Sequence, residues 1–371
     1  MVAFDSSTLG KVSRDYWSDQ KACRDRARTF LDQLTDRGVY IALTLTHVSE
    51  LLRHGNNDVV QERIRFLRNI RLIAWLRPYK RTWFPGGIPD LLMRELHAVV
   101  HCSARGWRGI IQCVRPDLWE TGTGADMFVE DPVLWSAIRR ECERQHQHEQ
   151  LIASIARTDA GGINDVKLRD AVNSPRRPKE ERANYARGLH AEMKRQLDRH
   201  GDRRLENAGN VAKNFCQDTL ERVAKIDELG DDPFQSILRL HGVPSELIGP
   251  KTTIGEIGEI AIYVRRLALL SDRLTPTAKL TISAVPPDVL PSHVLERGLA
   301  SLQGKASRVS GSDLGDSNLA PLAFYTDAVE VDKRMLGYLT QLQQGDARMT
   351  GLMGRPFRSS DYAQIPMQFG A

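Results

Sequence analysis

The sequence has no apolar run approaching the ~20 consecutive residues that a helix needs to cross a bilayer. Its amino terminus lacks the basic and then apolar pattern of a secretory signal peptide. The five cysteines are odd in number and form no CxxC motif, which disfavours a disulfide framework and a cysteine zinc site. Internal repeats and low-complexity segments are also missing. We therefore expect a soluble, cytoplasmic protein with free thiols.

The remaining composition is that of an ordinary globular protein. Of the 371 residues, 41% are hydrophobic and 27% are charged, which suits one large domain or two smaller ones. The formal net charge is +5, because Lys and Arg outnumber Asp and Glu. A positive balance of this size favours an anionic partner but does not identify it.

The first 80 residues alternate between helical and extended patterns. Apolar residues at helical spacing predict helices over Ser18–Arg37 and Val59–Ile70. Aliphatic and β-branched runs predict strands at Tyr40–Leu45 and Leu72–Leu76, in addition to the short apolar run Val2–Phe4. Such alternation is typical of a parallel α/β sheet.

From about residue 85 to about residue 286 the pattern becomes mostly helical. Helical spacing covers Asp131–Ala156, Lys179–His200, Leu205–Leu229 and Ile254–Leu270. A basic, proline-bearing turn in this region carries Arg176, Arg177 and Lys179. These three cations either contact substrate phosphates or belong to a solvated helical face, and the sequence weighs the two interpretations equally.

The α/β character returns near the end of the chain. We predict helices over Leu295–Ala306, Ser317–Tyr325 and Lys333–Leu342, with a strand at Ala328–Val331 between the last two. The predicted organisation is therefore an α/β core in two parts, residues 1–85 and 287–371, separated by an α-helical insertion at residues 86–286.

Acidic residues follow three of the predicted strands. Asp5 ends the first apolar run, Glu50 lies early in the helix after the second strand, and Asp332 follows the last strand. Because the carboxyl ends of parallel strands line one crevice, we expect these acids to meet although they lie far apart in sequence. Clustered carboxylates repel one another unless a cation is present, so the pattern predicts a divalent metal site.

This constellation resembles the PIN-like nucleases, a superfamily of metal-dependent nucleases. The shared pattern is an early acid with a hydroxyl residue two positions later, a Glu in the helix after a strand, an acid that opens a late helix and an acid after the next strand. Asp5 matches the early acid, and Ser7 matches the hydroxyl residue two positions later. Glu50 matches the Glu after a strand, and Asp316, or less well Asp313, matches the acid that opens the late helix. Asp332 matches the last acid, with Asp327 as a further candidate. The resemblance covers about residues 1–80 and 290–371.

The resemblance implies a PIN-like α/β/α sandwich with a central, mostly parallel sheet, interrupted by a large helical insertion. It implies a Mg²⁺- or Mn²⁺-dependent nuclease that hydrolyses phosphodiester bonds, with RNA favoured over DNA. Asp5, Glu50, Asp316 and Asp332 would be the catalytic metal ligands, with Asp313 and Asp327 as further candidates for the metal. Ser7, Lys333 and Arg334 would contact the substrate, the last two through a phosphate.

Other interpretations stay open at this point. A nuclease acting on DNA flaps or ends would use the same chemistry, and an inactive relative would bind nucleic acid or act as a scaffold. A homo-oligomer or a regulatory protein partner is compatible with each. Asp316 has a structural alternative as a helix N-cap. For His47, beside Glu50, a structural hydrogen bond is favoured over a contact with substrate. Residues 122–124 (Gly-Thr-Gly) are interpreted as a surface loop, since they follow no predicted strand.

Overall fold

The computed structural model describes residues 1–80, 85–131, 133–144, 165–173, 179–200, 207–228, 232–274, 280–304, 317 and 319–369. The chain divides into two compact units. The sheet unit comprises Met1–His146, Pro287–Ala306 and Ser312–Ala371, and the helical unit comprises Gln147–Pro286 and Ser307–Gly311. The segment 86–146, which the sequence analysis assigned to the helical insertion, therefore belongs with the sheet.

A six-stranded sheet organises the first unit, in the order β4-β3-β2-β1-β5-β6. All neighbouring strands are parallel except β3 and β4, which are antiparallel. This confirms the predicted α/β class with a mostly parallel sheet. The strands are β1 Val2–Ala3, β2 Ile41–Leu43, β3 Ile73–Leu76, β4 Trp119–Gly122, β5 Ala328–Glu330 and β6 Arg355–Phe357.

The helices of the sheet unit follow the strands in βα alternation. They are α1 Ser6–Tyr16, α2 Lys21–Asp36, α3 Leu45–Leu52, α4 Asn57–Arg68, α5 Ile88–His101, α6 Gly106–Leu118, α7 Gly124–Met127, α14 Pro291–Gly304 and α16 Lys333–Gly345, with 3-10 turns η3 Ala320–Phe324, η4 Tyr362–Gln364 and η5 Pro366–Gln368. Residues 133–144 are also helical. The predicted helix over Ser317–Tyr325 is α-helical at Ser317 and Leu319 and continues as the 3-10 turn η3. Residues 122–124 join β4 to α7 rather than forming a loop without a strand.

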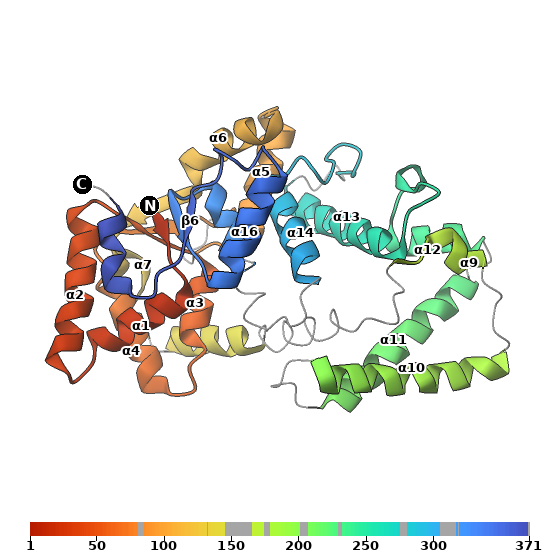
Figure 1. The fold of residues 1–371 in the computed structure, drawn as a ribbon, viewed down its shortest axis with the longest axis horizontal. Helices are drawn as coiled ribbons and strands as arrows, with labels where there is room; N and C mark the ends of the chain where they lie inside the picture. The colour runs from red at the N-terminus through yellow and green to blue at the C-terminus, as the bar shows by residue number, and fades with distance from the viewer. Residues whose placement is uncertain are drawn as a thin grey trace. The chain divides into compact units, whose positions relative to one another are not determined.

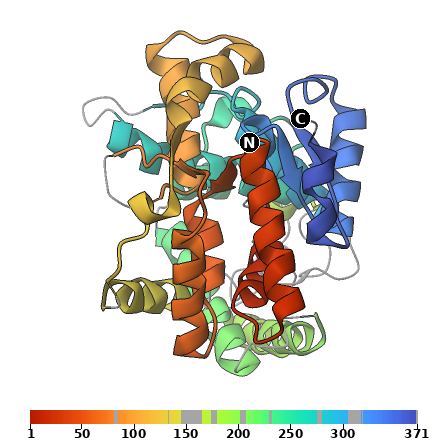
Figure 2. The ribbon, with the colours of Figure 1, turned by 90° about the vertical axis from the view of Figure 1, so that its left-hand side faces the viewer.

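Two helix groups cover the two faces of the sheet (Figure 1). The helices α1, α2, α3 and α4 contact one another, whereas α14 contacts both α5 and α16. The chain moves from β1 to β2 to β3 in one direction and from β5 to β6 in the other. Right-handed crossovers therefore place the first group and α16 on opposite faces. Figure 2 faces the amino-terminal helices, drawn in red and orange.

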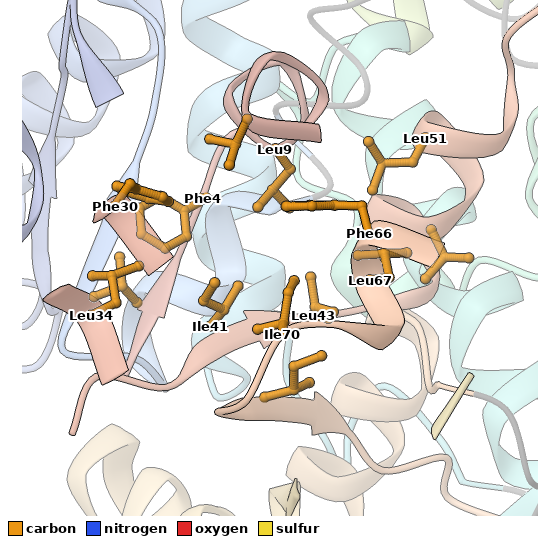
Figure 3. Close-up of a cluster of buried hydrophobic side chains, with 14 of the residues drawn as sticks. Phe4, Leu9, Phe30, Leu34, Ile41, Leu43, Leu51, Phe66, Leu67 and Ile70 are labelled. Carbon is orange, nitrogen blue, oxygen red and sulfur yellow. The ribbon is translucent and has the colours of Figure 1, made fainter. Parts of the chain in front are cut away.

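The core between α1–α4 and the sheet is built from aliphatic and aromatic side chains (Figure 3). Leu9 and Val12 of α1 are fully buried, and Phe4 packs edge-on against Phe30 with ring centroids 5.8 Å apart. Burying a side chain of this size stabilises the fold by about 1.5–3 kcal/mol. The core therefore holds the end of β1, where Asp5 follows Phe4, in a fixed position.

The helical unit contains α9 Leu168–Asn173, α10 Lys179–His200, α11 Ala208–Glu228, α12 Pro233–His241, η2 Ser245–Leu247 and α13 Ile254–Leu274. A small apolar cluster joins α10 to α11 through Met193, Leu197 and Ala212. Arg176 and Arg177 lie outside the described residues, and only the backbone of Lys179 is described. No helix in the described part of the chain is both long and apolar enough to span a membrane.

A buried carboxyl group ties distant segments of the sheet unit together. Glu95 of α5 is fully buried and accepts hydrogen bonds from the hydroxyl groups of Ser292 (2.6 Å) and Tyr325 (2.7 Å). Burial raises the pKa of Glu95 to about 7, although the bonds from Ser292 and Tyr325 favour the charged form and oppose this shift. These bonds join α5 to α14 and to the end of η3 across more than half of the sequence.

We expect Tyr325→Phe to lower the free energy of unfolding by about 1–2 kcal/mol, because Glu95 loses one donor. The loss should be larger at pH 8 than at pH 6, since Glu95 is charged above pH 7 and hydrogen bonds to charged groups are stronger. Urea unfolding at the two pH values measures both effects, with Tyr40→Phe as the control. Equal losses at pH 6 and pH 8 would contradict the ionisation of Glu95.

Candidate active site

Asp5 lies at the carboxyl end of β1, as the sequence predicts, and it also begins α1. It is the N-cap residue of this helix, and its side chain accepts a hydrogen bond from the amide of Ser7 at 2.6 Å. Asp followed by Ser-Ser-Thr is a favourable helix start, because Asp satisfies amides that have no partner within the helix. The local structure thus explains Asp5 in part without any ligand.

Glu330 is the acid that the structure brings next to Asp5. It is the last residue of β5, and the pairing of Ala3 with Val329 carries Glu330 level with the end of β1. Its carboxylate accepts hydrogen bonds from the hydroxyl of Thr8 (2.9 Å) and from the amide of Asp5 (3.3 Å). The Glu330 carboxylate therefore contacts the backbone of Asp5, which comes from the opposite end of the sequence, and lies close enough to the Asp5 carboxylate to feel its charge.

The environment of Glu330 opposes its negative charge. Its side chain is buried, and this burial is the largest cause that raises its pKa to about 7; the charge of Asp5 raises it further. The hydrogen bond from Thr8 and the charge of Lys11 act in the opposite direction. A carboxyl group held beside another carboxylate in this way binds a proton or a cation at neutral pH.

The position of this pair in the sheet is the one where ligands bind in open α/β folds. The chain leaves β1 towards β2 on one side, and β5 returns to the other side of β1. In such sheets ligands occupy the crevice at the carboxyl ends of the strands, where the strand order reverses. Asp5 and Glu330 follow or end the two strands that flank this point.

His47 fixes the same edge of the sheet from the interior. Its Nε2–H donates to the carbonyl of Phe4 at 3.0 Å, and its Nδ1 accepts from the amide of Thr44 at 3.0 Å. The side chain is fully buried, and this burial lowers its pKa to about 4, so it is neutral at physiological pH. His47 therefore ties the end of β1 to the end of β2, in the structural role given as its alternative.

Glu50 and Ser7 line the same cleft, which begins at the residues that directly follow Asp5, although neither Asp5 nor Glu330 lines it. The cleft has a volume of about 480 Å³ and runs between α1, α3 and α4. Ser6 and Ser7 line it from the first turn of α1, and Glu50 lines it from α3. The structure thus places Glu50 on the same cleft as the first turn of α1, while its meeting with Asp5 and Asp332 around a metal stays a prediction.

The other predicted residues are distributed differently. Asp332 is the N-cap of α16 and accepts from the amide of Met335 at 2.6 Å, and Lys333 and Arg334 are exposed in the first turn of that helix. Asp327 precedes β5, where its amide donates to the carbonyl of Met1 at 3.0 Å. It therefore lies at the opposite end of the strands from Asp5, which corrects its assignment to the metal.

Asp313 and Asp316 lie outside the described residues. Within the described residues, no group of three or more His, Cys, Asp or Glu side chains is arranged to hold a metal ion. Two carboxylates are still a suitable partial set for Mg²⁺ or Mn²⁺, because these ions prefer oxygen ligands and Mg²⁺ keeps several waters. The donor chemistry of Asp5 and Glu330 therefore fits a divalent cation.

Sequence reasoning missed Glu330 and Thr8. Glu330 stands inside the apolar run Ala328–Val331, so the sequence pattern assigns it to the strand. The same pattern assigns the metal ligand to Asp332, two residues later. The available signal was the charge itself, since a lone acid within a buried strand is costly unless it has a partner. Thr8 lies in a helix that the sequence analysis did not predict.

We expect Glu330→Gln to stabilise the metal-free protein by about 1–3 kcal/mol at pH 8, because the variant buries no charge beside Asp5. In the parent, folded Glu330 keeps its proton at pH values where the unfolded chain has already lost it. The free energy of unfolding that this proton contributes is therefore lost as the pH rises through the folded pKa of about 7. The advantage of the variant should therefore disappear at pH 5. Urea unfolding in EDTA measures this, with Glu246→Gln at an exposed position as control; a variant less stable than the parent at pH 8 would contradict it.

The lowered pKa of His47 predicts a loss of stability in acid. The unfolded chain binds a proton near pH 6.5, whereas folded His47 resists protonation down to about pH 4. The contribution of neutral His47 to the free energy of unfolding is therefore present above pH 6.5. It falls by about 3 kcal/mol as the pH is lowered to 4. The stability difference between the parent and His47→Gln should shrink over this range, as measured by urea unfolding from pH 7 to pH 4. An unchanged difference for His47→Gln would show that His47 titrates normally.

Comparisons with known proteins add no assignment to this geometry. The sequence matches no protein-family model. It matches no curated protein. The fold matches no solved structure.

Proposed function

We propose that this protein is a metal-dependent nuclease that hydrolyses phosphodiester bonds, of the PIN-like type and with RNA as its favoured substrate. The observation that carries the proposal is the contact of the Asp5 amide with the Glu330 carboxylate at the carboxyl ends of the neighbouring strands β1 and β5. Support also comes from the position of this pair at the reversal of strand order and from the cleft that opens beside it.

Asp5 and Glu330 would hold Mg²⁺ or Mn²⁺ through their carboxylate oxygens. Thr8 keeps one oxygen of Glu330 in place, and the amide of Ser7 does the same for Asp5. Glu330 gives up its proton when a cation replaces it, so binding should be stronger above pH 7 than below it. When bound, a divalent ion polarises the phosphoryl oxygen and lowers the pKa of an attacking water.

The PIN-like assignment is supported by the arrangement of the sheet unit. A parallel sheet lies between two groups of helices, and an acid follows its first strand with a hydroxyl residue two positions later. Glu330 takes the place that the sequence analysis gave to Asp332. Asp332 keeps a structural role as a helix N-cap.

A protein that binds nucleic acid without cutting it is the second candidate. It is favoured by the capping roles of Asp5 and Asp332, because both acids then have a structural use in the absence of metal. Glu330 also has structural partners in Thr8 and the amide of Asp5, but its burial beside Asp5 costs stability at neutral pH. This difference favours the metal-dependent enzyme.

Cleavage of labelled RNA and DNA panels with Mg²⁺, Mn²⁺ or EDTA tests the proposal. We expect cleavage with a metal, and a loss of more than ~100-fold in Asp5→Asn and Glu330→Gln, because metal stabilisation of the transition state is worth several kcal/mol. Asn keeps the N-cap, so Asp5→Asn should stay folded. Asp327→Asn, at the opposite end of the strands, should remain active. Full cleavage in EDTA, or by both acid variants, would rule out the proposed mechanism.

A further inference from the structure

The cleft beside Asp5 and Glu330 carries a set of donors that the proposed metal chemistry does not use. Two parallel rows of α1 side chains line it. Ser6, Gly10 and Ser13 recur at spacings of four and three, as do Ser7, Lys11 and Arg14, so each row follows one helix face. The remaining lining residues are Glu50, Leu51, His54, Val59, Glu62 and Arg63.

The side chain of Arg63 lies close to α1 at Gly10. A Cβ atom at this position would lie 3.9 Å from Nη2 of Arg63 and 3.9 Å from Cδ2 of Leu51. The guanidinium group is half buried, and this burial lowers its pKa. A cation withdrawn from water in this way gains if an anion is placed beside it.

Arg63 has donor capacity to spare. Its Nη1 donates to the carbonyl of Leu51 at 2.7 Å, and it forms no ion pair with a carboxylate in the part of the chain that the structure describes. A guanidinium carries five N–H donors, so one carbonyl does not exhaust it. Arg63 therefore presents a partly dehydrated cation to the cleft.

Ser6 and Lys11 add to this surplus of donors. The hydroxyl of Ser6 is buried, with the residue 9% exposed, and it has no hydrogen-bond partner among the described residues. Lys11 is exposed and forms no ion pair with a described residue, although its charge reaches Glu330. An unpaired buried hydroxyl between cations indicates a ligand that accepts hydrogen bonds.

Two of the cations that line the cleft are available to an anion. Lys11, Arg14 and Arg63 line it together with the carboxylates of Glu50 and Glu62, and Arg14 lies 3.8 Å from the carboxylate of Asp15. Lys11 and Arg63 form no ion pair with a described residue, so an anion is favoured beside these two. The lining contains no Phe, Tyr or Trp among the described residues, so base stacking is not offered there. The chemistry that remains is recognition of a backbone rather than of bases.

We propose that this cleft binds the sugar–phosphate backbone of a single nucleic-acid strand, with phosphates beside Lys11 and Arg63. The inference rests on the proposed function, because it places the scissile phosphate at Asp5 and Glu330. Lys11 lies six residues along α1 from Asp5, which is about 9 Å at 1.5 Å per residue. This distance suits a phosphate close to the scissile one on the same strand.

The size of the cleft selects a strand over a duplex. Its volume of about 480 Å³ is in the range of pockets for small ligands, which is room for about one or two nucleotides. A duplex is much wider, so it would rest on the rim without reaching Arg63. Exposed Lys11 would therefore contact the strand near the rim of the cleft, and half-buried Arg63 would contact the same strand deeper inside.

Binding of labelled single strands of RNA and DNA in EDTA tests the inference without turnover. We expect Lys11→Glu and Arg63→Ala to weaken binding by fluorescence anisotropy. Lys11→Ala should lower the slope of log K against log salt by about 0.7, as expected for one phosphate contact with a single strand. Arg65→Ala is the matched control, because Arg65 is exposed two residues along α4 and points away from Arg63. A labelled duplex should bind more weakly than the strand.

The outcomes separate this inference from the nuclease proposal. Lys11 is exposed, so Lys11→Ala should fold normally even if Arg63→Ala, which loses the bond to Leu51, does not. If the parent cuts nucleic acid while all Lys11 and Arg63 variants bind as tightly as the parent, the cleft inference is overturned and the nuclease survives. If a duplex binds more tightly than a strand through these residues, the single-strand assignment is overturned. If Lys11 and Arg63 variants lose binding of a strand that the parent never cuts, the cleft inference holds and the nuclease proposal fails.

Discussion

The burial of the Glu330 carboxyl group against Asp5 is the constraint on which the functional account depends. Glu330 comes from the end of β5 and Asp5 from the end of β1, so parallel pairing in fixed register is needed to bring them together. The nearby charge of Asp5 and a buried environment both oppose ionisation of Glu330. A divalent cation beside the two carboxylates would remove this opposition, which is the physical basis of the proposed metal site.

The surrounding structure holds this arrangement rigidly. Phe4 is buried in the core immediately before Asp5, and His47 binds its carbonyl from the side of β2. Thr8, one turn into α1, donates to Glu330. The first turn of α1 therefore has three functions. Asp5 caps the helix, Thr8 orients Glu330, and Ser6 and Ser7 form part of the wall of the cleft. A site held by a strand end, a helix start and a buried histidine is well suited to position a metal and a phosphate.

The sequence was sufficient to predict the parts of the fold with a strong local signal. The strands near residues 40 and 72 and the strand after Asp327 are continuous aliphatic runs, and α2, α4 and α16 have clear helical spacing. The start of α1 was not predictable in this way, since Ser-Ser-Thr and Gly10 are poor helix formers and its stability comes from packing of Leu9 and Val12. Strands β4 and β6 are short and carry Gly or Pro, and tertiary pairing determines them.

The candidate site was predictable only in outline. Asp5 could be located because an acid after an apolar run at the start of a sheet is unusual, and Glu50 because it follows the next strand. Glu330 could not be distinguished from a strand residue, because its role depends on the register between β1 and β5, which brings together residues more than 300 positions apart. The cleft cations Lys11 and Arg63 carry no motif. Lys11 is brought near the site by the formation of α1, and Arg63 by the packing of α4 against that helix.

The most direct test of the account is the number of protons released when the protein binds Mn²⁺. Calorimetric titrations in buffers of different ionisation enthalpy give this number at pH 6 and at pH 8.5. Because the pKa of Glu330 is about 7, the cation should displace close to one proton at pH 6 and far fewer at pH 8.5, and Glu330→Gln should abolish the release. Binding without proton release at either pH, or an unchanged release in Glu330→Gln, would contradict the claim that Asp5 and Glu330 form a cation site.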